Sequence, residues 1–124
     1  MRDMQMTKNF SRAEFACKGK GCCGGSAPIA AALVELLQAI RDNAGLPITV
    51  LSGFRCRLHN ERITGAHPDS YHTLGMAADI TCTAIDAALL YEICREEIAA
   101  AGYGFALLYS SQNFVHIDIR DWQP

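Results

Sequence analysis

The sequence reads SYHTLGMAAD at residues 70–79 and VHID at residues 115–118. These stretches supply two imidazoles and one carboxylate, those of His72, His116 and Asp79, which together form a ligand set that zinc accepts in proteins. Three protein ligands leave one coordination position open, and a water molecule in that position ionises near neutral pH. The two stretches therefore predict one catalytic zinc ion and metal-assisted hydrolysis.

The second stretch also predicts how the last strand of the fold is oriented. Side chains two apart on a strand share a face, so Phe114, His116 and Asp118 lie together and the apolar side chains between them occupy the opposite face. A shift of one residue would turn the His and Asp side chains into the core, and the apolar face therefore fixes the register. We expect the polar face to line a cleft.

Hydrophobic patterns along the rest of the chain predict two helices and three more strands. The first helix is expected to start at Ser26-Pro28 and to end at Ala44-Gly45, and the second to start between Thr83 and Asp86 and to end at Gly102. The further strands are expected over residues 48–51, 76–81 and 105–109, with a hairpin turn over residues 110–113 and a long functional loop over residues 57–70. Helices beside a mostly antiparallel sheet give an α+β fold.

The composition indicates one compact domain spanning residues 1–124, with residues 1–9 as a disordered end. The chain is 50% hydrophobic and 19% charged with a net charge of -2, and no run of Lys and Arg interleaved with aromatic side chains indicates a nucleic-acid surface. Residues 1–10 lack the apolar run of a secretory signal, and the apolar runs are shorter than the roughly 20 residues that span a bilayer. We expect a soluble monomer made in the cytoplasm, with no nucleic-acid partner and no transmembrane segment.

The chain contains six cysteines, a high number for its length. Cys17, Cys22 and Cys23 cluster in a loop rich in Gly and Lys, and with Cys56 they could bind a second, structural zinc ion or form disulfides. A reducing compartment disfavours a lasting disulfide, whereas the spacing does not complete a standard four-ligand zinc pattern. Both alternatives stay open, as does a set of loop thiols without partners. The other two cysteines lie in apolar patterns and are expected in the core.

Four motifs stand in order along the chain: FSRAEFAC at residues 10–17, SGFR at residues 52–55, and the two stretches quoted above. In this order they resemble peptidase family M15, which comprises zinc D-alanyl-D-alanine carboxypeptidases and related phage cell-wall endopeptidases. The resemblance covers about residues 10–120. It implies the hedgehog/DD-peptidase fold, a small and mostly antiparallel sheet with helices packed beside it.

The resemblance also implies roles for individual side chains. The two His and the Asp of the opening motifs correspond to the ligands of a single catalytic zinc ion. Arg55 corresponds to the cation that orients the substrate, and its planar fork suits a carboxylate or a developing oxyanion. We also expect Ser70 and His59 to contact the substrate, although a purely local hydrogen-bonding role for His59 stays open.

The sequence departs from the family at the position of the general base. Many members carry an acidic residue three positions before the last His ligand, where this chain has Asn113, and an amide does not accept a proton at neutral pH. Asp118 is the nearest carboxylate in the sequence. It is either the catalytic base or the hydrogen-bond partner of a ligand His, and the sequence favours neither role.

These features predict a zinc metallopeptidase that hydrolyses an amide bond in peptidoglycan stem peptides or cross-links, as a D-Ala-D-Ala carboxypeptidase or as an endopeptidase. The missing secretory signal and the phage-like motif suggest a phage or prophage lysis enzyme or virion hydrolase that acts on the cell wall after release. The alternative is a non-catalytic zinc-containing module of the same fold that binds cell wall or a protein partner, because Asn113 would matter less to such a module. The sequence leaves open which peptidoglycan bond is cut.

Overall fold

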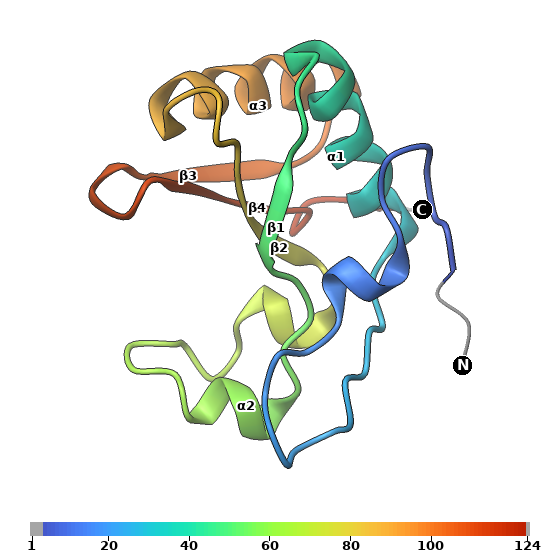
Figure 1. Ribbon diagram of the computed structural model, residues 1–124, viewed down its shortest axis with the longest axis vertical. Helices are drawn as coiled ribbons and strands as arrows, with labels where there is room; N and C mark the ends of the chain where they lie inside the picture. The colour runs from blue at the N-terminus through green and yellow to red at the C-terminus, as the bar shows by residue number, and fades with distance from the viewer. Residues whose placement is uncertain (1–3, 124) are drawn as a thin grey trace.

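The computed structural model describes residues 4–123, which form a four-stranded sheet with helices packed beside it (Figure 1). The strands are β1 (Thr49–Ser52), β2 (Ala77–Thr81), β3 (Phe105–Tyr109) and β4 (Phe114–Asp118). The helices are α1 (Ala31–Ala44), α2 (Arg57–Glu61) and α3 (Ala87–Ala101), and the short 3-10 helices are η1 (Arg12–Phe15), η2 (Tyr71–Leu74) and η3 (Ser110–Gln112). The order across the sheet is β1-β2-β4-β3 and every neighbouring pair is antiparallel. The predicted α+β fold is confirmed.

The two central strands pair so that Asp79 on β2 lies directly opposite His116 on β4. Directly opposite residues of antiparallel strands have Cβ atoms about 4.5–5.5 Å apart. On the other face of β4, Val115 and Ile117 are fully buried. The predicted division of β4 into two faces is confirmed, although Asp118 on the polar face is buried as well.

The hydrophobic core lies between the sheet and the two long helices. Helix α1 contacts α3, and α3 lies along β3 and β4. In Figure 1 these helices lie above the sheet and α2 lies below it. The inner face of α1 consists of apolar side chains at helical spacing, among them Leu33, Leu37 and Ile40, all with no exposed surface. The long helices therefore cover one side of the sheet and leave the other side to the loops that build the candidate site.

Helix α1 begins at Ala31 and not at the predicted start, Ser26-Pro28. The residues before it are extended because they pair with the chain that follows η2: the backbone N–H of Ala30 donates to the carbonyl oxygen of Gly75 at 2.9 Å. Gly75 has φ 69, and a Cβ atom there would overlap the carbonyl oxygen of Pro28. A contact between segments distant in the sequence thus overrides the local start signal.

The other predicted helix ends are confirmed. Helix α1 ends at Gly45 and α3 ends at Gly102, both in the left-handed conformation. Helix α3 starts after Asp86, whose carboxylate accepts the backbone N–H of Leu89 at 2.9 Å. These ends depend on residues within one turn of the helix, which is why the sequence could predict them.

Two segments expected to be a loop and a turn contain short helices. Helix α2 lies within the predicted loop over residues 57–70, and η3 lies within the predicted hairpin turn. The sulfur of Cys56 caps α2 by accepting the N–H of His59 at 3.4 Å. Cysteine is not among the residues that usually mark a helix start, so α2 could not be predicted from its first residues.

Residues 4–9, expected to be disordered, lie against α1. Gln5 forms a β-bridge with Ser11, and the hydroxyl of Thr7 donates to Oε1 of Gln38 at 2.8 Å. The remainder of the predicted disordered end, residues 1–3, lies outside the described residues. Within residues 4–123, no helix combines the length and the apolar character needed to cross a membrane.

The close approach of Gly75 to Pro28 predicts a difference in stability. Gly75→Ala should lower the free energy of unfolding by about 3 kcal/mol, because it adds both a left-handed alanine and a clash with backbone. Gly45→Ala is the matched control: φ is 65 but nothing lies within 4 Å of the added Cβ, so the loss should be ~1 kcal/mol. Urea unfolding measures both losses, and equal values would contradict the proposed contact.

Candidate metal centre

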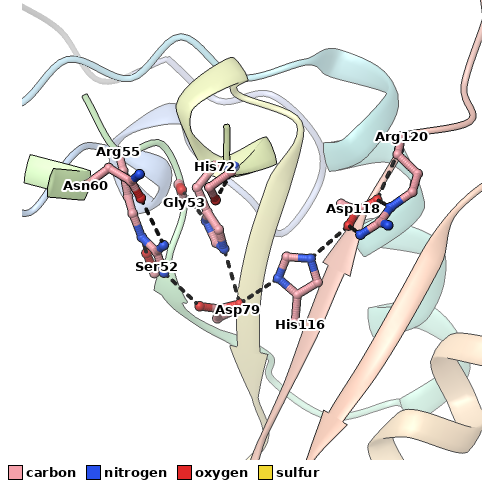
Figure 2. A network of polar contacts seen from close by, with 10 residues as sticks. Ser52, Gly53, Arg55, Asn60, His72, Asp79, His116, Asp118 and Arg120 are labelled. Carbon is pink, nitrogen blue, oxygen red and sulfur yellow. Dashed lines mark hydrogen bonds and ion pairs between the residues drawn. The ribbon is translucent and has the colours of Figure 1, made fainter. Parts of the chain in front are cut away.

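His72, Asp79 and His116, from η2, β2 and β4, point toward one another (Figure 2). Nε2 of His72 lies 3.3 Å and Nδ1 of His116 lies 3.1 Å from the same oxygen, Oδ1 of Asp79. The three candidate ligand atoms all lie within 4.8 Å of one another. In a tetrahedral zinc site with metal-to-ligand bonds of about 2.0–2.1 Å, neighbouring ligand atoms are about 3.3–3.4 Å apart. The donor types and their spacing therefore fit zinc.

Each histidine has its other ring nitrogen engaged outside this centre. Nδ1 of His72 lies 2.8 Å from the carbonyl oxygen of Gly53, and Nε2 of His116 lies 2.8 Å from Oδ2 of Asp118. A carbonyl and an ionised carboxylate only accept hydrogen bonds, so each of these two nitrogens carries a proton. The opposite nitrogens, Nε2 of His72 and Nδ1 of His116, face the centre, where each can offer a lone pair to a metal ion once it carries no proton.

Asp79 joins the two histidines to Arg55. Its Oδ1 faces both imidazoles, while its Oδ2 accepts a hydrogen bond from Nη2 of Arg55 at 3.3 Å (Figure 2). Burial alone would raise the pKa of Asp79, but hydrogen bonds from His116 and His72 outweigh burial and hold the pKa well below its ordinary range. Asp79 is therefore ionised at neutral pH and ready to act as an anionic ligand.

Arg55 is held by three different partners. Besides Asp79, its Nε donates to Oγ of Ser52 at 3.2 Å and its Nη1 donates to Oδ1 of Asn60 at 3.4 Å. Asn60 is buried and also donates to the carbonyl oxygen of His67 at 2.9 Å. Asn60 was not predicted as a site residue, because nothing in a polar loop marks which amide turns inward. Together these contacts fix the guanidinium beside the candidate ligands.

Asp118 is fully buried, and both of its oxygens are engaged. Besides the contact with His116, it accepts two hydrogen bonds from the guanidinium of Arg120, at 2.9 and 2.7 Å, and one from the backbone N–H of Arg120 at 3.1 Å. Burial raises the pKa of this carboxyl, but the hydrogen bonds from Arg120 and His116 reverse the effect and lower the pKa to about 2. Of the two roles that the sequence left open for Asp118, these contacts match the partner of a ligand His.

Arg120 was not predicted as a site residue. It lies two positions after Asp118, where the alternation of an extended chain places it on the same face. The alternation already used for His116 could therefore have indicated Arg120. Its guanidinium also lies over the rings of Phe105 and Tyr71, 3.9 and 4.8 Å from their centroids, which adds cation–π attraction to the ion pair.

Asn113 faces away from the candidate centre. It closes the turn between β3 and β4 in the left-handed conformation, with φ 55, which Asn adopts more readily than most residues. Its side-chain oxygen accepts the N–H of Ala87, the first residue of α3, at 3.0 Å, and its carbonyl oxygen accepts the hydroxyl of Thr81 at 3.0 Å. Asn113, at the position where many family members carry an acid, thus stabilises the turn after β3 and the start of α3 in this chain.

The three candidate ligands open into a cleft of about 700 Å³. One wall is formed by residues 63–67 and 69–71, and the other includes Tyr109 and Phe114, whose rings stack with centroids 4.6 Å apart. The polar side chains in the lining carry charges of both signs and include Arg55, His67, Asp69, Ser70 and Arg120. The cleft therefore offers aromatic surface and charged groups beside the candidate metal position.

Of the three side chains that the sequence predicted as substrate contacts, two line the cleft and one does not. Arg55 and Ser70 line the cleft, and Oγ of Ser70 also caps η2 by accepting the N–H of His72 at 3.2 Å. His59 is not among the lining residues. The ring of His59, on α2, points toward the N-terminal loop, which carries Cys17, Cys22 and Cys23. A Cβ atom on Gly19 of that loop would lie 2.7 Å from Cγ of His59. His59 thus packs against that loop in place of the expected substrate contact.

Comparison with known proteins gives a family and a fold. A family model described as Peptidase M15 matches residues 8–118. Among solved structures, the chain is similar to the crystal structure of the Serratia marcescens L-Ala D-Glu endopeptidase ChiX, with a TM-score of 0.58 and 15% sequence identity over 73% of this chain and 80% of that chain. At this identity the likeness shows the fold alone. No curated protein matches the chain.

The hydrogen bonds of His116 predict its protonation in the metal-free chain. Burial lowers its pKa, but hydrogen bonds to Asp118 and Asp79, together with their charges, raise the pKa to about 9. His116 should therefore be protonated at pH 7 without metal, and zinc should displace this proton, so that affinity falls as the pH is lowered. Imidazole NMR signals of the metal-free chain, recorded before and after zinc is added, test this; a neutral His116 ring at pH 7 without metal would contradict it.

Proposed function

The chain belongs to the peptidase M15 family, and on that premise we propose that it is a zinc-dependent peptidase that hydrolyses an amide bond in bacterial peptidoglycan. The observation that carries this proposal is the convergence of His72, Asp79 and His116 at an open cleft. Three protein ligands beside an open position are the arrangement of catalytic zinc sites. Zinc there supplies Lewis acidity and lowers the pKa of a bound water, both of which favour amide hydrolysis at neutral pH.

Arg55 is the side chain that we expect to hold the substrate. Its guanidinium has more N–H donors than its contacts with Ser52, Asn60 and Asp79 use. The free donors lie beside the candidate metal position and can bind a carboxylate or carbonyl oxygen of a peptide. The stem peptides of peptidoglycan carry several carboxylates, which makes them suitable ligands for a cleft that contains two arginines.

Asp118 serves in this proposal as a positioning residue. Its contact with Nε2 of His116 selects the tautomer whose Nδ1 can bind metal, and the ion pair with Arg120 holds the carboxylate in place. A fully buried carboxylate with these partners is a poor acceptor for a proton from the cleft. Asp69 is the remaining carboxylate, besides Asp79, among the described residues that line the cleft.

The bond to be cut is proposed from the comparisons together. ChiX is described as an L-Ala D-Glu endopeptidase and shares the fold, and the family resemblance also includes D-Ala-D-Ala carboxypeptidases. We therefore place the stem-peptide bonds L-Ala-D-Glu and D-Ala-D-Ala first among the substrates, ahead of cross-bridge bonds. The motif at residues 10–17 suggests a phage or prophage lysis enzyme or a virion hydrolase as the biological setting.

A binding module without catalysis is the second candidate function. It is favoured by one observation: Asn113 faces α3 and Asp118 is committed to Arg120, so neither supplies a base to the cleft. A zinc centre could then act as a ligand for a cell-wall peptide or for a protein partner.

Hydrolysis of defined stem peptides decides between the two functions. The zinc-loaded chain should release fragments from isolated peptidoglycan and from peptides that contain L-Ala-D-Glu or D-Ala-D-Ala bonds, as identified by mass spectrometry. A chelator should abolish the release and added zinc should restore it. His116→Ala should lose essentially all activity, because it removes a ligand of the catalytic metal.

The matched control for that variant is His67→Ala, which alters a His in the cleft wall outside the ligand set. It should keep zinc-dependent cleavage. The peptidase proposal would be wrong if the folded chain, with zinc bound at the His centre, released no fragments from any of the peptides. Binding of the same peptides without cleavage would then support the module.

Asp118→Asn separates a positioning residue from a general base. The amide can still accept the N–H of His116 but loses the charge that pairs with Arg120, so activity should need about 10–100-fold more free zinc for half-saturation. Excess zinc should restore most of the rate. Asp86→Asn is the control, because Asn caps a helix as well as Asp does and α3 lies outside the site. If the rate of hydrolysis instead falls by about 100-fold or more and excess zinc does not restore it, Asp118 is the general base.

A further inference from the structure

Four thiols from two distant parts of the chain meet outside the cleft. Cys17, Cys22 and Cys23 belong to the N-terminal loop, and Cys56 is the N-cap of α2. Their Sγ atoms all lie within 4.8 Å of one another, and those of Cys17 and Cys22 are 4.0 Å apart. In Figure 1 this loop, coloured blue, runs beside α2 at the lower end of the molecule.

The mutual spacing of the sulfurs is close to that of a tetrahedral metal site. With Zn–S bonds of about 2.3 Å, the sulfurs of a four-thiolate zinc site lie about 3.8 Å apart. The observed group needs only a small contraction to reach this spacing. Disulfides join sulfurs in pairs and give no reason for four of them to be mutually close.

Backbone donors are already directed at two of the sulfurs. The N–H of Cys56 points to Sγ of Cys17 at 3.5 Å, and the N–H of His59 points to Sγ of Cys56 at 3.4 Å. Such donors stabilise negative charge on sulfur and orient it, which is what the outer shell of a thiolate site does. The fold therefore prepares these sulfurs to be ligands.

The surroundings offer compensating charge and a closely fitted backbone. Four thiolates around a divalent ion carry a net charge of about -2, and the loop contributes Lys18 and Lys20 while the α2 region contributes Arg57 and Arg62. The guanidinium of Arg62 donates to the carbonyl oxygen of Lys20 at 2.8 Å, which ties the two segments together. A Cβ atom on Gly19 would lie 2.6 Å from Sγ of Cys22, so the loop passes too close to the sulfurs for any side chain.

We propose that Cys17, Cys22, Cys23 and Cys56 bind a second, structural zinc ion. Four protein ligands leave no open position, so this ion takes no part in catalysis. Its ligands are separate from those of the candidate catalytic centre, and the proposal does not depend on the peptidase function.

The second ion would fasten the segment that supports the candidate active site. Cys56 directly follows Arg55, and the N–H of Phe54 donates to the carbonyl oxygen of Phe15 at 2.8 Å. The same segment provides the carbonyl oxygen of Gly53 that orients His72. Zinc would thus join the N-terminal loop to the backbone that presents Arg55, and its binding energy would add to the stability of the fold.

Metal content of the His116→Ala protein tests the proposal without reference to activity. All four cysteines of the cluster are intact in this variant, so it should retain one zinc ion per chain, whereas the unaltered chain should hold about two. Cobalt substituted into His116→Ala should show the intense near-ultraviolet absorption of thiolate-to-cobalt charge transfer. The thiols of the cluster should resist alkylation until the metal is removed.

Two cysteine variants provide the matched pair. Cys56→Ser should weaken zinc binding to the cluster and lower the cobalt–thiolate absorption of His116→Ala, because one of the four thiolates is removed, while serine keeps the cap of α2. Cys94→Ala, at a buried cysteine outside the cluster, should leave both signals unchanged. Overturning results would be a folded His116→Ala protein that binds no zinc at saturating metal, or a cluster found paired as disulfides in the freshly isolated chain. Zinc at the cysteines without peptidase activity would refute only the proposed function.

Discussion

The pairing of Asp79 with His116 across β2 and β4 is the constraint on which the candidate centre depends. Ladder hydrogen bonds set the register, and the register sets the separation of carboxylate and imidazole without any flexible segment between them. A slip of one residue would move these side chains to the opposite face. Val115 and Ile117, buried on the far face of β4, oppose such a slip and so support the site from a distance.

The other two residues of the site, His72 and Arg55, come from segments that are less regular than the two strands. The third candidate ligand, His72, comes from a short 3-10 helix and is oriented by the carbonyl oxygen of Gly53. Arg55 comes from the irregular chain after β1 and relies on side-chain contacts. A centre built mainly on strands keeps its geometry better than one built on loops. The cysteine cluster lies next to the least regular of these segments, the chain that carries Arg55. A metal ion bound by the cluster would restrain that segment most.

The sequence predicted most of the fold and the set of residues that converge, because both depend on short-range patterns. Alternation placed His116 on the polar face of β4, and the caps at Gly45 and Asp86 ended α1 and began α3. The failures depend on long-range contacts. The start of α1 is displaced by Gly75, and no periodicity in a polar segment shows which way the five residues of α2 turn His59.

The two oxygens of Asp79 have a consequence for the dimensions of the site. One faces the imidazoles and the other faces Arg55, so a single carboxylate spans the interval between the metal position and the cation that would hold the substrate. Fixed covalent geometry sets the separation of the two oxygens, and the 3.3 Å hydrogen bond from Arg55 sets the rest of the interval. The distance from this cation to the metal position therefore varies less than it would if the loops alone set it, and a substrate that binds at both places must match this distance.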